Sequence, residues 1–382
     1  MRPSANVNLS RRPWLRAGLC AGTLLASFVL ADRALALDPN KSVYQYICQN
    51  WSQQQGLPAN GINCIAQAAD GYLWLGASRG LIRFDGVNFY MVEMAETNRL
   101  RTTEVLSMVA SPDGGLWLGI KKSAYGHYDG HGGWTLSKES SDGTVWNVPF
   151  MMQSKDGRLW FGGERACVRS TNGEVQALFP DASTRIVVTS GLEDSHGRIW
   201  LGTAQNGLFY MDQGKMVKYG GAPFDSTYLT VLAEDKSGHI WTGGNLDLIC
   251  FDPGAPPKIQ YPGGVISALL ADKDGALWVG TFGNGLLRYY NGVWSSLKKT
   301  DGLGDDFVVS LAEDREGSLW VGTREGLSQL TDVKLPTLGI KDGLGWETAL
   351  GVSASPRGGV WVGTLGRDVH IGITLHHKQR LE

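Results

Sequence analysis

Twelve side chains that could bind a polar ligand recur at similar distances from one repeated tryptophan. Basic, amide or aromatic residues stand four to six positions after successive copies of it, and carboxylates or aromatics stand 13 to 15 positions before it. Sugar rings stack on aromatic faces while charged and amide groups bond to hydroxyls, so this mixture suits a polar ligand such as an oligosaccharide. The candidate ligand-binding residues are Arg79, Lys121, Arg165, Asn206, Asn245, Phe282, Arg324, Glu104, Trp146, Tyr228, Asp306 and Trp346.

The repeated tryptophan shows which elements must position these side chains. It follows an apolar residue and stands two positions before a glycine, at spacings of 43, 43, 40, 41, 37, 42 and 41 residues. The eight copies are Trp74, Trp117, Trp160, Trp200, Trp241, Trp278, Trp320 and Trp361. A fixed period near 40 residues with strand-like contents is typical of a radial repeat array.

One repeat contains short strands separated by glycine turns. In the seventh copy, segments 308–312, 319–323 and 327–330 have strand length and composition, and glycines close the turns between them. Four such strands per repeat form one propeller blade, with the tryptophan buried against the next blade. We therefore predict an all-β fold, a β-propeller of four-stranded blades. Segment 44–51 aligns with an outermost strand and could complete the last blade, which favours seven blades; an eight-bladed ring is the alternative.

The repeat register places all twelve candidate residues on one face of the ring. Turns between the second and third strands, and loops that lead into the innermost strand, open on the same face in a propeller. These loops also differ most between the repeats, and loops on a rigid scaffold usually carry function. The sequence thus predicts one variable, ligand-binding face.

The sequence gives less support to a catalytic site than to a ligand-binding face. Acid–base catalysis would need a histidine and a carboxylate together at the central channel, but His196 and His239 stand in turns expected on the opposite face. Paired glycosidase carboxylates could come from Asp306, Glu347 and Glu104, at a separation that the sequence does not set. The sequence has no phosphate loop, G-x-S-x-G motif or metal-ligand cluster. We expect no enzyme activity, cofactor or metal site.

Residues 1–36 have the features of a secretory signal peptide. Four arginines precede an apolar stretch, 17–31, and Ala34-Leu35-Ala36 is a cleavage signal. Segment 10–16 is similar to a twin-arginine export signal, although an ordinary signal with a chance arginine pair fits equally well. We expect cleavage after Ala36 and a periplasmic or secreted protein.

Removal of that signal leaves 30 basic and 36 acidic residues, a net charge of −6. Such a chain has no general affinity for nucleic acid or anionic lipid, and no later apolar stretch has the length of a membrane span. Four cysteines remain, without zinc-site spacing. Cys48 and Cys64 could form a disulfide on neighbouring strands, and buried free thiols are the alternative.

The repeat resembles the two-component regulator propeller repeat. Trp320-Val321-Gly322-Thr323 followed by Gly326-Leu327 carries the resemblance, as does the linking phrase Asp301-Gly302-Leu303, which recurs as Asp342-Gly343-Leu344 and Gln55-Gly56-Leu57. It covers roughly residues 43–364 in eight copies.

The resemblance implies the periplasmic sensing part of a histidine kinase or related regulator. Family members are expected to have two seven-bladed propellers, a β-sandwich, a membrane helix and an output domain. Here we find about half the repeats, and the pattern is lost after Thr364. We therefore interpret residues 37–364 as a propeller-only, truncated sensor and residues 365–382 as an aberrant tail. Expected partners are an oligosaccharide or other small ligand and either a second copy or a membrane sensor subunit. A protein-binding scaffold, or less so a propeller lyase or glycosidase, is the alternative.

Overall fold

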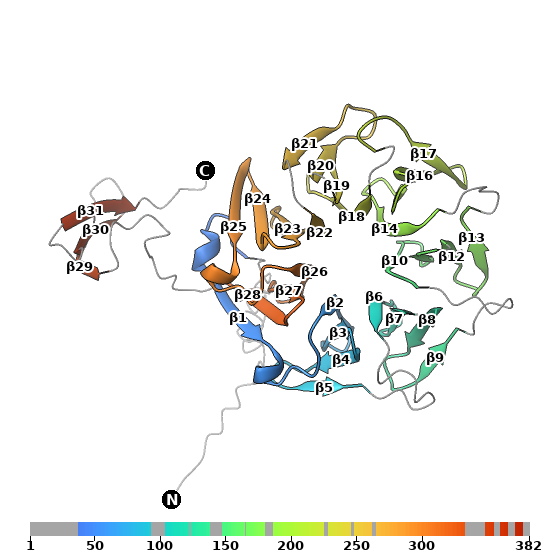
Figure 1. Cartoon of the computed structure of the whole chain (residues 1–382), viewed down its shortest axis with the longest axis horizontal. Helices are drawn as coiled ribbons and strands as arrows, with labels where there is room; N and C mark the ends of the chain where they lie inside the picture. Colours follow the sequence, from blue (N-terminus) through green and yellow to red (C-terminus); the bar gives the residue numbers. More distant parts are fainter. Residues whose placement is uncertain are drawn as a thin grey trace, which may run out of the picture. The chain divides into compact units, whose positions relative to one another are not determined.

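Seven four-stranded antiparallel sheets surround a common centre as the blades of a β-propeller (Figure 1). The computed structural model describes residues 37–92, 104–121, 124–137, 147–164, 166–179, 186–224, 228–245, 248–261, 265–332, 348–354, 360–365 and 371–376. Within these ranges the helices are three single 3-10 turns, η1 (Val43–Gln45), η2 (Gln53–Gln55) and η4 (Lys299–Asp301). The predicted all-β, seven-bladed architecture is confirmed.

In blades one to six the strands follow chain order from the innermost to the outermost. Blades one to three contain β2 (Ile62–Gln67), β3 (Leu73–Ala77), β4 (Gly80–Phe84) and β5 (Phe89–Met91); β6 (Val105–Ala110), β7 (Leu116–Ile120), β8 (Ala124–Tyr128) and β9 (Trp134–Leu136); and β10 (Phe150–Gln153), β11 (Leu159–Gly162), β12 (Cys167–Arg169) and β13 (Val175–Ala177). Blades four to six contain β14 (Val188–Glu193), β15 (Ile199–Thr203), β16 (Leu208–Asp212) and β17 (Lys215–Tyr219); β18 (Leu229–Glu234), β19 (Ile240–Gly244), β20 (Leu248–Phe251) and β21 (Lys258–Tyr261); and β22 (Ile266–Ala271), β23 (Leu277–Thr281), β24 (Leu286–Tyr290) and β25 (Val293–Leu297).

Blade seven joins the two ends of the repeat region. Its inner strands are β26 (Val308–Glu313), β27 (Leu319–Thr323) and β28 (Leu327–Thr331), and its outermost strand is β1 (Ile47–Trp51), as predicted for segment 44–51. The pairing of β1 with β28 is antiparallel, from Ile47 opposite Thr331 to Trp51 opposite Leu327. A strand from the start of the chain therefore completes the last blade, and the eight-bladed alternative is wrong.

The innermost strands are joined across the seams between blades, and the closing seam is like the others. The Ser310 hydroxyl donates to the Ile62 carbonyl at 2.9 Å across seam seven–one. The Ser107 hydroxyl makes the same bond to Val148 at 2.7 Å across seam two–three. The seam that closes the ring is thus bonded in the same way as the seam between blades two and three.

The repeated tryptophan is the core residue of its blade, as predicted. Six copies, in blades one and three to seven, are at most 4 % exposed, whereas Trp117 is half-buried. The glycine two positions later lets the blades approach each other: a Cβ on Gly322 would lie 2.7 Å from the carbonyl oxygen of Ile62 in the next blade. The two residues therefore form one packing unit, with a large side chain in the core and bare backbone at the seam.

A carboxylate six residues before the tryptophan accepts its indole N–H in the last four blades. The distances are 2.9 Å from Trp200 to Asp194, 2.7 Å from Trp241 to Asp235, 2.8 Å from Trp278 to Asp272 and 2.7 Å from Trp320 to Asp314. Blade three uses Ser154 at this place, at 2.9 Å from Trp160. Blade one has Ala68, and the buried Trp74 N–H has no partner among the described residues. The aspartate also accepts backbone N–H groups of the turn, so it ties the turn to the core.

The eighth copy forms a separate three-stranded sheet of β29 (Thr348–Ala354), β30 (Val360–Leu365) and β31 (Ile371–His376). Its Trp361 is 39 % exposed, unlike the tryptophans of the ring. The expected loss of the pattern after Thr364 needs correction, because Ile371–His376 pairs along β30. The sequence alternates apolar residues at positions 371, 373 and 375, which is a strand pattern, although the glycine-leucine phrase is missing.

Cysteine side chains are free thiols at all four described positions. Cys48 lies on β1 in blade seven and Cys64 on β2 in blade one, so the disulfide considered between them is not formed. Burial raises the pKa of Cys48 to about 11 and that of Cys64 to about 12. The structure thus supports the free-thiol alternative, with Cys167 and Cys250 buried and Cys48 and Cys64 partly buried.

Candidate functional site

The two predicted sets of loops lie against each other on one face of the ring. In several blades, an N–H in the turn between the second and third strands donates to a carbonyl of a loop that leads into an innermost strand. These bonds run from Ser78 to Gly61, Lys121 to Glu104, Ala204 to Val187, Phe282 to Val265 and Arg324 to Phe307, at 2.9–3.1 Å. We call the face formed by these two sets of loops the candidate face.

Aromatic side chains form an exposed pair where blades six and seven meet on the candidate face. Phe282 is 46 % exposed and Phe307 is 37 % exposed, and their rings meet edge to face with centroids 5.8 Å apart. A β-bridge between the same two residues fixes their backbones. The Arg324 guanidinium lies 5.0 Å from the Phe307 centroid, within cation–π distance. This cluster offers a preformed ring surface beside a fixed positive charge.

Asp306 holds the loop that carries this pair. Its carbonyl accepts the N–H groups of Gly283 and Gly285, both at 3.0 Å. Its carboxylate accepts the N–H of Lys299 at 2.7 Å. Both glycines have positive φ, 101° and 75°, which explains why the turn needs them. Asp306 thus positions the aromatic pair and ties it to the link between blades six and seven.

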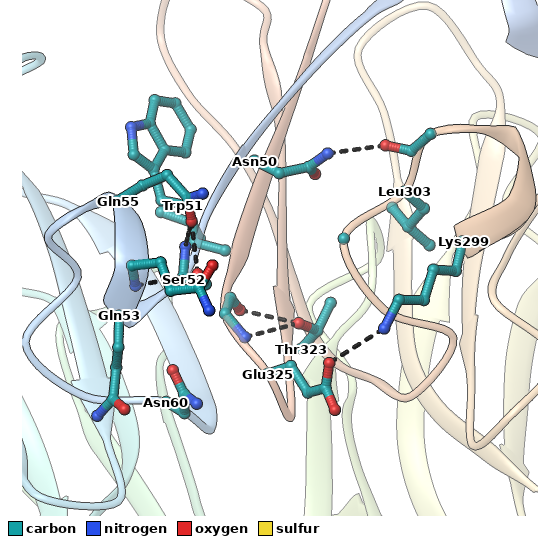
Figure 2. A pocket seen from close by; sticks show the side chains of 15 residues that line it. Asn50, Trp51, Ser52, Gln53, Gln55, Asn60, Lys299, Leu303, Thr323 and Glu325 are labelled. Atoms are coloured by element: carbon teal, nitrogen blue, oxygen red, sulfur yellow. Dashed lines mark hydrogen bonds and ion pairs between the residues drawn. The ribbon is translucent and has the colours of Figure 1, made fainter.

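That link forms one wall of a groove of about 610 Å³ (Figure 2). Lys299 and Glu325 lie on this wall as an ion pair at 3.1 Å, and the bond to Glu325 raises the pKa of Lys299. Gln53 and Asn60 lie on the opposite wall, which the chain builds as it passes from β1 to β2. The groove therefore sits where the start of the chain meets blade seven.

Several polar groups of the groove have no partner in the described part of the protein. The buried Oδ1 of Asn60 accepts no hydrogen bond there, and the side-chain amides of Gln53 and Gln54 make none. Asn50, by contrast, donates to the Gly302 carbonyl at 2.8 Å and accepts from the Ser328 hydroxyl. Polar groups that fold against each other are thus mixed with amides free to bond a ligand, as in small-molecule sites.

Both walls carry the same short motif. The 3-10 turn η2 ends at Gly56 with φ 91°, and η4 ends at Gly302 with φ 110°. These are the glycines of the linking phrase Gln55-Gly56-Leu57 and of its counterpart Asp301-Gly302-Leu303. The predicted site did not include Gln53, Gln54 or Lys299, because they stand on these links and not in the turns. The linking phrase was the signal that could have indicated them.

A second pair of predicted residues meets between blades one and two. The Lys121 ammonium and the Glu104 carboxylate are 2.5 Å apart. The Asn63 amide donates to the same carboxylate at 3.2 Å and to the Val105 carbonyl at 2.9 Å. Because its partners are neighbouring protein groups, this pair stabilises a seam in the described structure.

Of the remaining predicted residues, some are dispersed over other blades and others lie outside the part of the chain that the structure describes. Arg79 lies exposed on blade one, whereas Asn206, Tyr228 and Asn245 belong to blades four and five. Asn206 donates its backbone N–H to the Thr203 hydroxyl, a turn contact. Three predicted residues, Trp146, Arg165 and Trp346, lie outside the described residues. The structure thus brings Phe282, Asp306 and Arg324 together at blades six and seven, whereas Asn206, Tyr228 and Asn245 lie on blades four and five.

Histidines with carboxylate neighbours occur near the turns that precede the repeated tryptophan, away from the candidate face. The Nδ1 of His239 lies 3.1 Å from Asp235 and its Nε2 lies 3.5 Å from Asp252. His127 lies 3.2 Å from Asp113. The described residues hold no group of three or more histidine, cysteine or acidic side chains that could bind a metal. Nor does any helix in the described ranges have the length and apolar character needed to cross a bilayer.

Comparison with known proteins supports both the repeat and the ring. The family model described as "Two component regulator propeller" matches residues 56–79, 260–283 and 302–325. A search of curated proteins finds no match.

Solved structures with the same fold include two from Bacteroides thetaiotaomicron. The extracellular domain of the putative hybrid two component system BT3049 has 18 % identity and a TM-score of 0.71, over 86 % of this chain and 48 % of that one. The corresponding domain of BT4673 has 20 % identity and a TM-score of 0.64, over 84 % and 44 %. The present chain thus spans about half the length of these structures.

Propeller enzymes share the fold at lower similarity. Virginiamycin B lyase from Staphylococcus aureus, solved in a catalytically inactive form with quinupristin, has 14 % identity and a TM-score of 0.61, over 75 % of this chain and all of that one. Identity this low is informative about the fold alone. Three repeats of this chain match the model of the two component regulator propeller, and its seven-bladed ring has the fold of the extracellular domains compared above.

Proposed function

We propose that this chain is the ligand-sensing propeller of a two-component signalling regulator and binds a polar ligand, such as an oligosaccharide, on the candidate face. The signalling role is supported by the family model and by the two extracellular domains with the same fold. Their extracellular location favours a periplasmic or secreted position here as well. The chain is proposed to act by binding, without catalysis, and to pass the signal to a second copy or to a membrane subunit.

One observation carries the choice of site: the Phe282–Phe307 pair and the groove meet at Lys299. The Lys299 backbone N–H donates to the carboxylate of Asp306, the residue before Phe307, and the Lys299 ammonium is paired with Glu325 in the groove. If one sugar unit stacked on the exposed ring of Phe307, the next sugar unit of the oligosaccharide would extend toward Lys299 and the unbonded side-chain amide of Gln53. Apolar ring faces and hydroxyls would then both find partners, which is the requirement for carbohydrate recognition.

The test is a thermal-shift screen of the purified protein against neutral and acidic oligosaccharides, followed by calorimetry. A ligand that binds the folded state raises the melting temperature by mass action. Phe307→Ala and Arg324→Ala should each weaken binding at least tenfold without lowering the melting temperature of the free protein. Lys215→Ala, which removes an exposed positive charge on β17, is the matched control and should leave affinity unchanged.

Two outcomes would count against the proposal. Equal titration heats for the wild type, Phe307→Ala and Arg324→Ala would remove the site from the candidate face. A sharply melting protein that none of the oligosaccharides stabilises would favour the alternative, a scaffold that binds another protein at the cell envelope.

A further inference from the structure

On the face opposite the candidate face, backbone-to-side-chain bonds join neighbouring blades at four seams. The last residue of an innermost strand accepts the N–H of a turn residue in the preceding blade. The bonds are Lys155 to Glu193 at 2.6 Å, Ser195 to Glu234 at 2.7 Å, Lys273 to Glu313 at 3.1 Å and Arg315 to Gln67 at 2.8 Å. Seams three–four, four–five, six–seven and seven–one therefore share one device, which we call the seam clamp.

The other three seams lack the clamp, each for a reason visible in the sequence. At seam one–two, Ala69 faces Ala110, so neither side offers a charge. At seam two–three, Pro112 has no N–H to donate, and the Oε1 of Gln153 is buried without a partner in the described structure. At seam five–six, Lys236 stands in the donor position but Ala271 replaces the glutamate. Among these three seams, seam five–six is thus the one with a lysine at the donor position and no carboxylate at the acceptor position.

The consequence for Lys236 is clear when it is compared with its counterparts. The ammonium groups of Lys155 and Lys273 donate to carbonyls of the next blade, at 3.1 Å from Asp194 and 2.8 Å from Asp314. Neither the ammonium nor the backbone N–H of Lys236 is bonded to any residue in the described ranges. Its aliphatic stem lies over Gly275 of blade six. Two donors that elsewhere hold the next blade are therefore available at this seam.

A groove of about 670 Å³ opens at this seam. Lys236 lines it with Gly275 and Leu277, and Leu277 is paired to Ala271 across the sheet. Tyr289 supplies an aromatic wall, packed 5.4 Å from Trp241. Blade five, β18 to β21, and blade six, β22 to β25, are neighbours in the ring (Figure 1). The groove therefore lies beside the seam that lacks the glutamate, with Lys236 on its blade-five side and Gly275 and Leu277 on its blade-six side.

The carboxylates of the groove are engaged with protein groups. Asp235 accepts the Trp241 indole N–H at 2.7 Å and the Ser237 backbone N–H at 2.9 Å. His239 lies between Asp235 and Asp252. The donors of Lys236 remain, and the second lysine of the groove, Lys258, makes no hydrogen bond with the described residues. The groups of the groove that remain without a hydrogen-bond partner within the described residues are therefore positively charged donors, which suit an anionic ligand.

We propose that the groove at seam five–six binds a carboxylate-bearing small molecule, whose carboxylate takes the place of the missing glutamate on the N–H and ammonium of Lys236. The three seams where a glutamate carboxylate meets the same N–H show the geometry that the ligand reproduces. This second site lies opposite the candidate face and is independent of it. Because the ligand bridges blades five and six as the clamp does elsewhere, its binding stiffens that seam.

Calorimetry with glucuronate and with glutamate as probes, and glucose as the neutral control, tests the site on the purified protein. At least one acid should bind saturably while glucose does not; glucuronate alone points to an acidic sugar, and glutamate alone to an acidic amino acid. Lys236→Ala, a substitution of an exposed residue, should weaken binding at least tenfold. Lys215→Ala is the matched control, and Arg324→Ala on the candidate face should leave this affinity unchanged.

Ala271→Glu supplies the missing side chain and gives a second, independent readout. It should raise the melting temperature of the free protein and abolish binding of the acid, because the internal carboxylate then occupies the donors of Lys236. Binding to this variant with wild-type affinity would overturn the proposal. So would an absence of saturable heat with both acids, or undiminished binding by Lys236→Ala.

Discussion

Replacement of Asp314 by alanine should destabilise the ring by about 3 kcal/mol. Its carboxylate accepts the Trp320 indole N–H and the Ser318 N–H, both at 2.7 Å, and is 6 % exposed. Hydrogen bonds to a charged group contribute about 1.5–3 kcal/mol each, and a buried donor left alone costs about 1–3 kcal/mol. Relief of the buried charge offsets part of that loss, which leaves about 3 kcal/mol.

Thermal unfolding converts this into a measurable shift. A ring of about 300 residues has an unfolding entropy of roughly 0.6 kcal/mol/K, so the expected decrease in melting temperature is about 5 °C. Asp314→Asn retains one acceptor and should recover about half of it. Asp212→Ala, at an exposed strand end, is the control. A melting temperature for Asp314→Ala within 1 °C of this control would refute the argument that the turn carboxylate stabilises the blade.

Three further predictions concern other blades. Ala68→Asp gives the buried Trp74 N–H the acceptor found in blades four to seven, and should stabilise the protein by about 1 kcal/mol; urea unfolding should show a higher midpoint with an unchanged slope. Trp51→Ala removes the β1 ring that stacks 5.7 Å from Trp320, and should cost about 3 kcal/mol in the same assay. Burial raises the pKa of Asp272 above its ordinary 3.8, so its contribution to stability is present below pH 3.8 and declines as the pH rises through the raised pKa. Asp272→Asn should remove that part of the pH dependence of the melting temperature, and identical pH profiles would contradict the assignment.

The fold could be predicted because its information is local and repeated. Each copy of the tryptophan and glycine carries its own strands and turns, and eight copies set the period despite variation in any one of them. Closure by β1 was also predictable, because segment 44–51 is an outermost strand without an inner neighbour of its own. The strand Ile371–His376 was missed since the phrase used to recognise it was absent, although its alternation was present.

The site could be predicted only in part. Phe282, Asp306 and Arg324 stand at repeat positions, so their common face followed from the register. The groove is different, because Gln53 and Lys299 are far apart in sequence and meet only when β1 joins blade seven. The missing clamp at seam five–six likewise depends on a difference between repeats, because Ala271 stands where three other blades have a glutamate. The role of those glutamates becomes visible only once the bonds across the seams are known.

The closing strand also constrains when the ring can form. Asn50 of β1 bonds to Ser328 of β28 across 278 residues of chain, and such distant contacts are the slow ones in folding. While the chain is being made, β1 must wait for blade seven, and until the two meet β1 and β28 present unpaired strand edges. The vulnerable period of this protein is therefore the interval between the appearance of its first strand and that of its last blade, and cellular factors that protect nascent strands should matter most then.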